Sequence, residues 1–192
     1  MTGTVWLMRH GALAPNPERR FVGQGDIPLS ELGRRQAMAW RQFLQDIPLA
    51  AIVSSDLSRC METAQLVKGQ RDIPLIHEPA FREISLGAWE GLTRCEVEKR
   101  FPGAYAERGK DMAHFHPQGG ESFADLAFRV LPAFGKLISS YAGQQLLIVS
   151  HAGSNRVIIA QYLALPLQNV LDIPQPYAGC ATLVVDAQSH AP

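Results

Sequence analysis

The sequence predicts an α/β fold: a mostly parallel central sheet with helices on both faces, in three layers, and an irregular lid or small subdomain. Short apolar runs typical of buried strands alternate along the chain with amphipathic segments of helical period. The 192 residues, 46% hydrophobic and 19% charged, are enough for one domain with a sizeable core. Residues 79–120 interrupt the alternation because they are rich in glycine, proline and aromatic residues, as expected for a segment that covers a site.

The first half of the chain predicts three strands and two helices. Residues 4–9 form an apolar run that is expected to be a buried strand. Ser30 is expected to cap a helix over residues 30–45, because apolar residues recur on one helical face there: Ala37, Trp40, Phe43 and Leu44. The other elements of this half are a strand over residues 50–54, a helix over 57–68 and a short strand over 74–77.

Two capping patterns mark helix starts in the second half. Thr93 and Glu96 have the capping-box form, and Ser122 and Asp125 are similar, so the second of these helices is expected to run to about Ser139. The most strand-like run of the chain, a further helix and a last strand follow, over residues 146–150, 154–163 and 181–185. We expect residues 1–192 to form a single domain, with residues 79–120 as a lid or subdomain insertion.

Composition excludes several classes of function. The formal net charge is zero, so we expect no nucleic-acid partner and no attraction to an anionic membrane. We find neither an apolar stretch long enough to span a membrane nor a signal peptide. The cysteines Cys60, Cys95 and Cys180 are widely spaced and odd in number, which indicates reduced thiols in a cytoplasm.

Basic and titratable side chains follow three of the predicted strands. Arg9 and His10 follow the first strand, Arg59 lies in the first turn of a helix after the second, and His151 follows the strand at 146–150. Because ligands of open α/β sheets bind beyond the carboxyl ends of the strands, these side chains meet in one pocket if the strands are neighbours. Arginine suits phosphate, and a helix beginning near Gly153 would aim its amides at the same place. The pattern predicts a phosphate site; the alternatives are a solvated Arg-His loop and a core histidine at His151.

Other motifs are expected to be structural. His114 and His116 share one face of a strand if that segment is extended, but they lack nearby carboxylate or cysteine partners for a metal, so a place in the pocket lining or on the surface is expected. Residues 119–122 contain two glycines but lack the Lys-Ser/Thr ending of a P-loop, which favours a helix-entry turn. The basic pairs at 19–20 and 34–35 are expected to be solvated, with a contact from the first pair to a substrate anion left open.

Four blocks of residues occur in order between residues 5 and 153. The first joins Leu7-Met8-Arg9-His10-Gly11 to Gly23-x-x-Asp26-x-Pro28-Leu29-Ser30-x-x-Gly33-x-x-Gln36-Ala37. The others are Ser54-Ser55-Asp56-Leu57-x-Arg59-x-x-x-Thr63-Ala64, Arg82-Glu83-x-x-x-Gly87-x-Trp89-Glu90-Gly91 and Val149-Ser150-His151-Ala152-Gly153. Together the blocks span about three quarters of the chain and resemble the histidine phosphatase superfamily, the phosphoglycerate-mutase-like proteins.

The resemblance implies a role for each matching residue. His10 would be the nucleophile that accepts the phosphoryl group, and Glu83 the general acid that becomes the general base. The phosphoryl oxygens would be surrounded by Arg9, Asn16, Arg59 and His151. No metal or other cofactor is expected. The guanidiniums beside His10 would disfavour imidazolium and keep the nucleophile neutral. Glu90 is a competing carboxylate that we expect to be a structural hydrogen-bonding partner.

Two departures from the family pattern favour a phosphatase over a mutase. Ala12-Leu13 and Val22 stand where many members carry polar residues, which makes the expected pocket floor less polar. The chain also ends soon after the last predicted strand, whereas the mutases carry a longer C-terminal tail. A phosphatase must admit water, and a short open chain suits that requirement.

The substrate is expected to be a small phosphate ester. Residues 117–123 and 179–183 are similar to bacterial α-ribazole phosphatases, which implies α-ribazole 5'-phosphate as a substrate and a role in cobalamin assembly. The alternatives are a phosphoserine or sugar-bisphosphate phosphatase, a phosphotransferase of the mutase type, and a non-catalytic phosphate-binding module. The oligomeric state is open, with a homodimer as one alternative. Aromatic residues that would stack on a base, or pack in the core, are Trp6, Trp89, Tyr105, Phe115 and His116.

Overall fold

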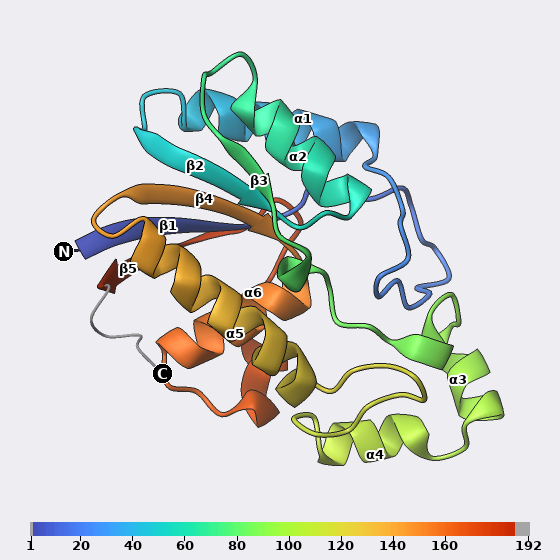
Figure 1. Ribbon diagram of the computed structural model, residues 1–192. Helices are drawn as coiled ribbons and strands as arrows, with labels where there is room; N and C mark the ends of the chain where they lie inside the picture. The colour runs from blue at the N-terminus through green and yellow to red at the C-terminus, as the bar shows by residue number, and fades with distance from the viewer. Residues whose placement is uncertain (1, 187–192) are drawn as a thin grey trace.

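The computed structural model describes residues 2–186, which contain one five-stranded sheet in the order β3-β2-β4-β1-β5 (Figure 1). The pairs β1–β4, β2–β4 and β2–β3 are parallel, and β5 runs antiparallel to β1. The predicted mostly parallel sheet is therefore confirmed, with the direction of the last strand as a new detail. The strands are β1 Thr2–Arg9, β2 Leu49–Ser54, β3 Leu75–His77, β4 Gln145–Ser150 and β5 Cys180–Asp186.

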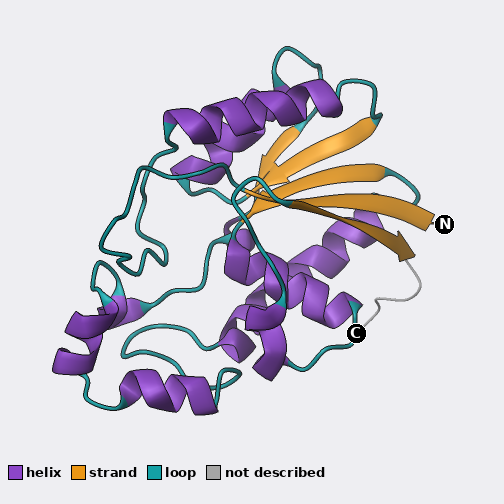
Figure 2. Ribbon diagram, turned by 180° about the vertical axis from the view of Figure 1, so that it is seen from behind, coloured by secondary structure: helices purple, strands orange, loops and turns teal. Residues whose placement is uncertain are grey.

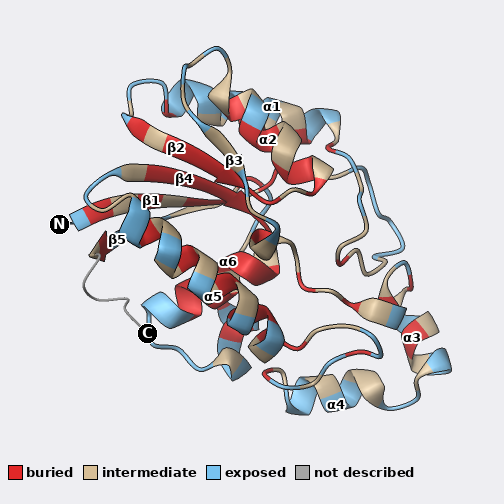
Figure 3. Ribbon diagram, viewed as in Figure 1, coloured by how far each residue is buried: buried red, intermediate tan, exposed pale blue. Residues whose placement is uncertain are grey.

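Helices cover both faces of the sheet. α1 and α2 lie on one face, and α5 and α6 lie on the other, as the two opposite views show (Figures 1 and 2). Each pair packs its own apolar cluster against the sheet, so the two strands β2 and β4 are almost wholly buried (Figure 3). Because β4 is covered on both sides, it is a continuous apolar run. The four helices are α1 Glu31–Phe43, α2 Ser58–Lys68, α5 Phe123–Ser140 and α6 Ala152–Tyr162.

Helix starts follow the predicted caps. Ser30 accepts the amide of Gly33 at the start of α1, and Thr93 forms a capping box with Glu96 at the start of α3 (Arg94–Arg100). Ser122 forms the second capping box at the start of α5. The Gly-Gly segment before Ser122 is thus a helix-entry turn, as predicted.

The segment over residues 79–120 stands at the end of the molecule toward which the parallel strands point (Figure 1). It holds short 3-10 helices at Pro79–Phe81 and Gly87–Trp89, α3, and α4 (Ala104–Lys110), a helix that the sequence did not predict. α4 has no buried residue, so it lacks the apolar stripe that marks a helix in a sequence. That this segment closes over the site stays a prediction.

An aromatic cluster holds that segment together. The ring of Trp89, 1% exposed, lies 5.6 Å from that of Phe21, 6.1 Å from that of Tyr105 and 5.7 Å from that of Phe115. Three of the aromatics considered for stacking on a base, Trp89, Tyr105 and Phe115, are therefore packed in this cluster, whereas Trp6 packs against Phe43. Among the described residues, no helix is long and apolar enough to cross a bilayer.

Candidate active site

The strand order brings the ends of β1, β2 and β4 to one edge of the sheet, and with them the predicted site residues His10, Arg59 and His151. β4 lies between β1 and β2, so the carboxyl ends of these parallel strands are neighbours. Arg9 ends β1 opposite Ser150, the last residue of β4, and the His10 amide donates to the Ser150 carbonyl at 3.0 Å. On the other side the Ser55 amide donates to the Val149 carbonyl at 3.0 Å. The chain therefore leaves all three strands at the same place.

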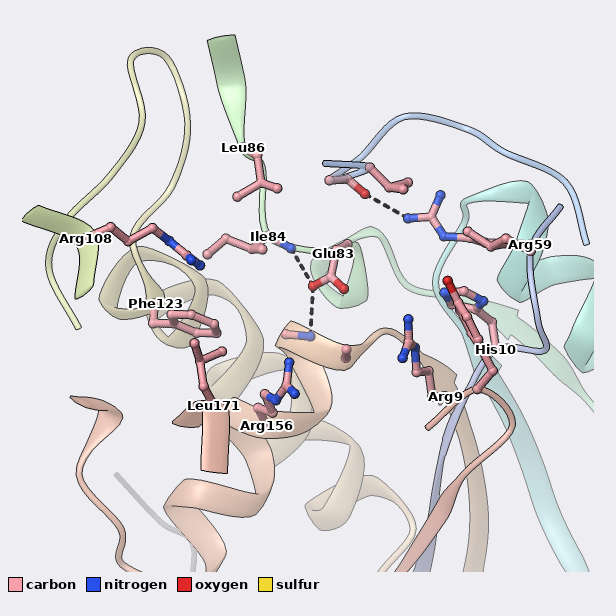
Figure 4. Close-up of a pocket in the computed structure, with 16 residues that line it drawn as sticks. Arg9, His10, Arg59, Glu83, Ile84, Leu86, Arg108, Phe123, Arg156 and Leu171 are labelled. Carbon is pink, nitrogen blue, oxygen red and sulfur yellow. Dashed lines mark hydrogen bonds between the residues drawn. The ribbon is translucent and has the colours of Figure 1, made fainter. Parts of the chain in front are cut away.

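A cavity of about 200 Å³ opens at this edge, between the sheet and the segment 79–120 (Figure 4). Basic side chains from different elements meet there with one carboxylate. Its lining is formed by Arg9, His10, Leu13, Val22, Gly23, Arg59, Glu83, Ile84, Leu86, Arg108, Phe123, Ala152, Gly153, Arg156, Leu171 and Tyr177. The cationic lining suits an anionic ligand, and the two apolar departures Leu13 and Val22 do form part of the wall.

The His10 imidazole is fixed in one orientation. Its Nδ1 lies 2.8 Å from the Gly11 carbonyl oxygen, which only accepts, so Nδ1 carries the proton and Nε2 keeps its lone pair. The residue is 3% exposed. Burial lowers the pKa of His10 to about 3, helped by the charges of Arg59 and Arg9 and opposed by the Gly11 carbonyl. The ring is therefore neutral at ordinary pH.

Arg59 is a buried guanidinium held at three points. Its Nε donates to Nδ1 of His151 at 3.2 Å, and its two terminal nitrogens donate to the carbonyls of Gly25 at 2.6 Å and Gly23 at 2.9 Å. A guanidinium has about five N–H donors, so roughly two remain for an oxyanion in the cavity. Because the fork is planar and immobile at 1% exposure, it presents those donors in one fixed direction.

His151 is fully buried against Arg59 and His10 and is not part of the cavity lining. Its ring centre is 5.2 Å from that of His10. Because Nδ1 accepts from Arg59, the proton sits on Nε2, which lies 2.9 Å from the Ser55 hydroxyl. Burial and the charge of Arg59 hold the pKa of His151 well below its usual range. Both ring nitrogens are thus engaged by the protein, and the predicted contact to phosphoryl oxygens stays a prediction.

Arg9 is positioned by the loop that precedes β5. Its guanidinium stacks 3.9 Å over the ring of Tyr177 and donates to the Gln175 carbonyl at 2.5 Å. The Tyr177 ring also lies 5.6 Å from that of His10. The Ala178 amide donates to the His10 carbonyl at 3.0 Å, which ties this loop to the nucleophile's own backbone.

The Glu83 carboxylate extends into the same cavity (Figure 4). Its Oε1 accepts the amides of Ile84 and Gly153, both at 2.9 Å, and Gly153 lies in the first turn of α6. A side chain at Gly153 would place its Cβ 2.2 Å from Oε1, so only glycine allows this approach. The helix amide that was expected to reach a phosphate therefore holds Glu83 instead, and leaves Oε2 for the cavity.

Several residues considered from the sequence lie elsewhere. Asn16 is exposed, outside the cavity lining, and exchanges hydrogen bonds with the Arg20 backbone at 2.8 and 3.0 Å, so its predicted phosphate contact stays a prediction. Glu90 accepts the amides of Gln24 and Leu86 and is structural, as expected. His114 pairs with Asp111 on the surface, and no cluster of three or more metal-binding side chains occurs within residues 2–186.

Three polar residues of the cavity lining were not predicted from the sequence: Tyr177, Arg156 and Arg108. Tyr177 reaches the site because β5 is antiparallel, so the residues before it lie at the same edge as the ends of β1 and β4. Arg156 is one helical turn beyond Ala152, a spacing that the sequence did contain. Arg108 lies on α4, and no pattern marked it.

The site and the fold together define a hydrolase of phosphate monoesters. The model of the histidine phosphatase superfamily (branch 1) matches residues 5–191, and the chain belongs to that family. A glucosyl-3-phosphoglycerate phosphatase of Mycolicibacterium vanbaalenii is 35% identical over 170 residues, which cover 85% of this chain and 75% of that protein.

Two further relatives agree with this assignment. The adenosylcobalamin/α-ribazole phosphatase of Salmonella typhimurium is 32% identical over 162 residues, 84% of this chain and 80% of that protein. The solved structure of Bacillus stearothermophilus YhfR superposes with a TM-score of 0.87 at 36% identity, covering 96% of this chain and 92% of that one. The predicted family and the predicted enzyme class are therefore confirmed.

Proposed function

We propose that this phosphomonoesterase needs no metal and works through a phosphohistidine formed on His10. The observation that carries the proposal is the state of the His10 ring: Nδ1–H is held by the Gly11 carbonyl, so the lone pair of Nε2 is available at ordinary pH. A buried, neutral, fixed imidazole beside two arginines is a nucleophile already aligned for an anionic substrate.

In the first step Nε2 of His10 attacks phosphorus and the bond from phosphorus to the ester oxygen breaks. Arg9 and Arg59 bind the non-bridging oxygens and stabilise the charge that develops on them. Oε2 of Glu83 gives its proton to the departing oxygen. His151 acts through Arg59, whose fork it orients by accepting from Nε; we propose this positioning role beside the direct contact that the family resemblance implies.

In the second step water attacks the phosphohistidine. Glu83, now a carboxylate, accepts the proton of the attacking water, the bond from Nε2 to phosphorus breaks, and inorganic phosphate leaves. The amides of Ile84 and Gly153 hold Oε1 throughout both steps. The other oxygen, Oε2, therefore donates the proton in the first step and accepts one in the second without reorientation of the carboxylate.

The substrate is a small phosphate ester. A cavity of about 200 Å³ is smaller than the range of about 300–1,000 Å³ typical of drug-sized ligands. α-Ribazole 5'-phosphate stays one candidate, supported by the Salmonella relative. Glucosyl-3-phosphoglycerate is a second, supported by the mycobacterial relative. Phosphoserine, a sugar bisphosphate and transfer of the mutase type are the remaining alternatives.

The three free thiols, among them the buried Cys60, support a location in a reducing cytoplasm.

The test compares phosphate release from p-nitrophenyl phosphate and from a panel of cellular esters, with and without a chelator. We expect full activity with chelator and loss of activity in His10→Ala. Glu83→Gln should lose more of kcat/KM, which reports the phosphoryl-transfer step, with alkyl esters than with p-nitrophenyl phosphate, because p-nitrophenolate leaves without a proton. Wild-type rates in His10→Ala would overturn the nucleophile, and equal losses of kcat/KM for both kinds of ester in Glu83→Gln would overturn the general acid.

A further inference from the structure

The cavity contains two arginines that the proposed chemistry does not use. Arg108 from α4 and Arg156 from α6 line the same space as His10. Figure 4 shows Arg108 on the side of the cavity opposite His10 and Arg59, with Glu83 between them and Arg156 below. The charges of Glu83 and Arg9 affect the pKa of Arg156, whereas the pKa of Arg108 responds to Arg156. The two guanidiniums therefore continue the basic lining away from the phosphoryl site.

Neither guanidinium is neutralised by the protein. In the part of the chain that the structure describes, no ion pair involves Arg108 or Arg156. Arg156 uses Nε to donate to the Ile173 carbonyl at 3.0 Å, which leaves its two terminal nitrogens for other partners. Arg108 lies 6.0 Å from the ring centre of Phe123. Burial lowers the pKa of both groups; Tyr105 raises the pKa of Arg108 and Glu83 raises that of Arg156, and each is opposed by a neighbouring arginine.

Other half-buried arginines of this protein differ. Arg129 pairs with Glu121 through Nε at 2.7 Å, and Arg82 pairs with Asp56 at 2.5 Å. In these two cases the fold supplies a carboxylate, and in the half-buried Arg71 it supplies backbone carbonyls to both terminal nitrogens. Two partly desolvated cations that line one cavity without a paired carboxylate cost stability unless an anion joins them. Ile84 and Leu86 line the cavity on the same side of Glu83 as Arg108, and these apolar side chains suit an uncharged part of the substrate (Figure 4).

We infer that Arg108 and Arg156 form a second oxyanion site, so that the preferred substrate carries a carboxylate or a second phosphate at the end remote from the scissile phosphoryl group. The inference rests on the proposed function for the orientation of the substrate. It predicts that phosphate esters of hydroxy acids, and bisphosphates, bind more tightly than phosphate esters of neutral alcohols. Charge-assisted, fork-shaped contacts of this kind are expected to change affinity by about ten- to hundredfold.

The test measures binding by calorimetry in a His10→Ala background, where no ester is consumed. Two matched pairs of ligands separate the two sources of the anion: 3-phosphoglycerate against glycerol 3-phosphate for a carboxylate, and fructose 1,6-bisphosphate against fructose 6-phosphate for a phosphate. We expect the doubly anionic member of at least one pair to bind at least about tenfold more tightly. The ratio of the two dissociation constants within a pair should fall toward about one in Arg108→Gln and in Arg156→Gln, while Arg108→Lys should keep part of the preference.

Lys110→Gln is the matched control, because it removes one positive charge from an exposed site on the same helix. It should leave the ratio unchanged. Equal binding of both members in both pairs, or a ratio that persists in Arg108→Gln and Arg156→Gln, would overturn the second site. If His10-containing enzyme releases no phosphate from any ester but the ratio behaves as expected, the proposed function fails and the second anion site stands.

Discussion

Nε of Arg59 donates to Nδ1 of His151 at 3.2 Å, although one residue starts a helix after β2 and the other follows β4. This bond fixes the plane of the guanidinium and the proton position on the imidazole together. Both depend on the adjacency of β2 and β4, so the sheet order itself aligns the phosphate donors.

Replacing Arg59 by lysine tests this fork. An ammonium cannot reach His151 and two carbonyls in one plane, so we expect kcat/KM for p-nitrophenyl phosphate to fall by about 100-fold or more. Arg34→Lys is the control, because Arg34 makes a half-exposed pair with Glu62 on another surface. A loss in Arg59→Lys of less than about threefold would show that a point charge is sufficient.

Gly153→Ala tests the anchoring of Glu83. The new Cβ would lie 2.2 Å from Oε1, so the carboxylate must leave the start of α6. We expect kcat/KM to fall by about 10-fold or more for alkyl esters and by less for p-nitrophenyl phosphate, because general acid catalysis of the phosphoryl-transfer step is impaired. Gly109→Ala on α4 meets nothing within 4 Å and should leave kcat unchanged. Equal losses for both kinds of ester in Gly153→Ala would contradict this account.

The buried histidines should make stability depend on pH. Because the folded protein holds the pKa of His10 at about 3, the unfolded chain binds more protons between that pH and about 6.5. The free energy of unfolding should therefore fall as pH is lowered through this window, by up to about 1.4 kcal/mol per pH unit for each such histidine. His151 contributes with the same sign.

Urea unfolding between pH 4.5 and 7 measures this slope. His10→Gln should reduce it by about 1 kcal/mol per pH unit, whereas His114→Gln, which removes an exposed imidazole, should not. Because carboxylates titrate in the same range in every variant, the difference between variant and parent is the relevant quantity. Parallel slopes for His10→Gln and the parent would contradict a buried neutral His10.

Tyr177 is expected to be a positioning residue for Arg9 and His10. Tyr177→Phe keeps the stacked ring and should change kcat/KM by less than about threefold. Tyr177→Ala removes the face under Arg9 and admits water to His10, so KM should rise by about tenfold and the acidic limb of the pH profile of kcat/KM should move to higher pH. A lower kcat/KM with an unmoved pH profile would indicate a merely structural ring.

The sequence was most informative where local chemistry decides structure. The apolar run of β4 and the capping boxes at Thr93 and Ser122 specify their elements without help from the rest of the chain. Arg9, His10 and Arg59 could be placed together because strand ends of a parallel sheet share one edge. Because these signals are local in sequence, they can be recognised before the structure is known.

Features that depend on tertiary direction were not predictable. Residues 180–186 read the same whether the strand runs parallel or antiparallel, and only the second case brings Tyr177 to Arg9. Arg108 looks like a solvated charge on a short polar helix until the segment 79–120 is folded against α5. Glu83 followed from family resemblance alone, and its hold on the Gly153 amide needed the structure.

The most direct test of the account traps the phosphoryl group on His10. Glu83→Gln should form the phosphoenzyme from p-nitrophenyl phosphate, since p-nitrophenolate needs no acid, but should hydrolyse it slowly for lack of a base. Rapid quenching at alkaline pH and peptide mass spectrometry should then find one phosphoryl group on His10, after a burst of about one p-nitrophenolate per site. Turnover without any burst or labelled His10 peptide, or a label on another residue, would contradict phosphoryl transfer through this histidine.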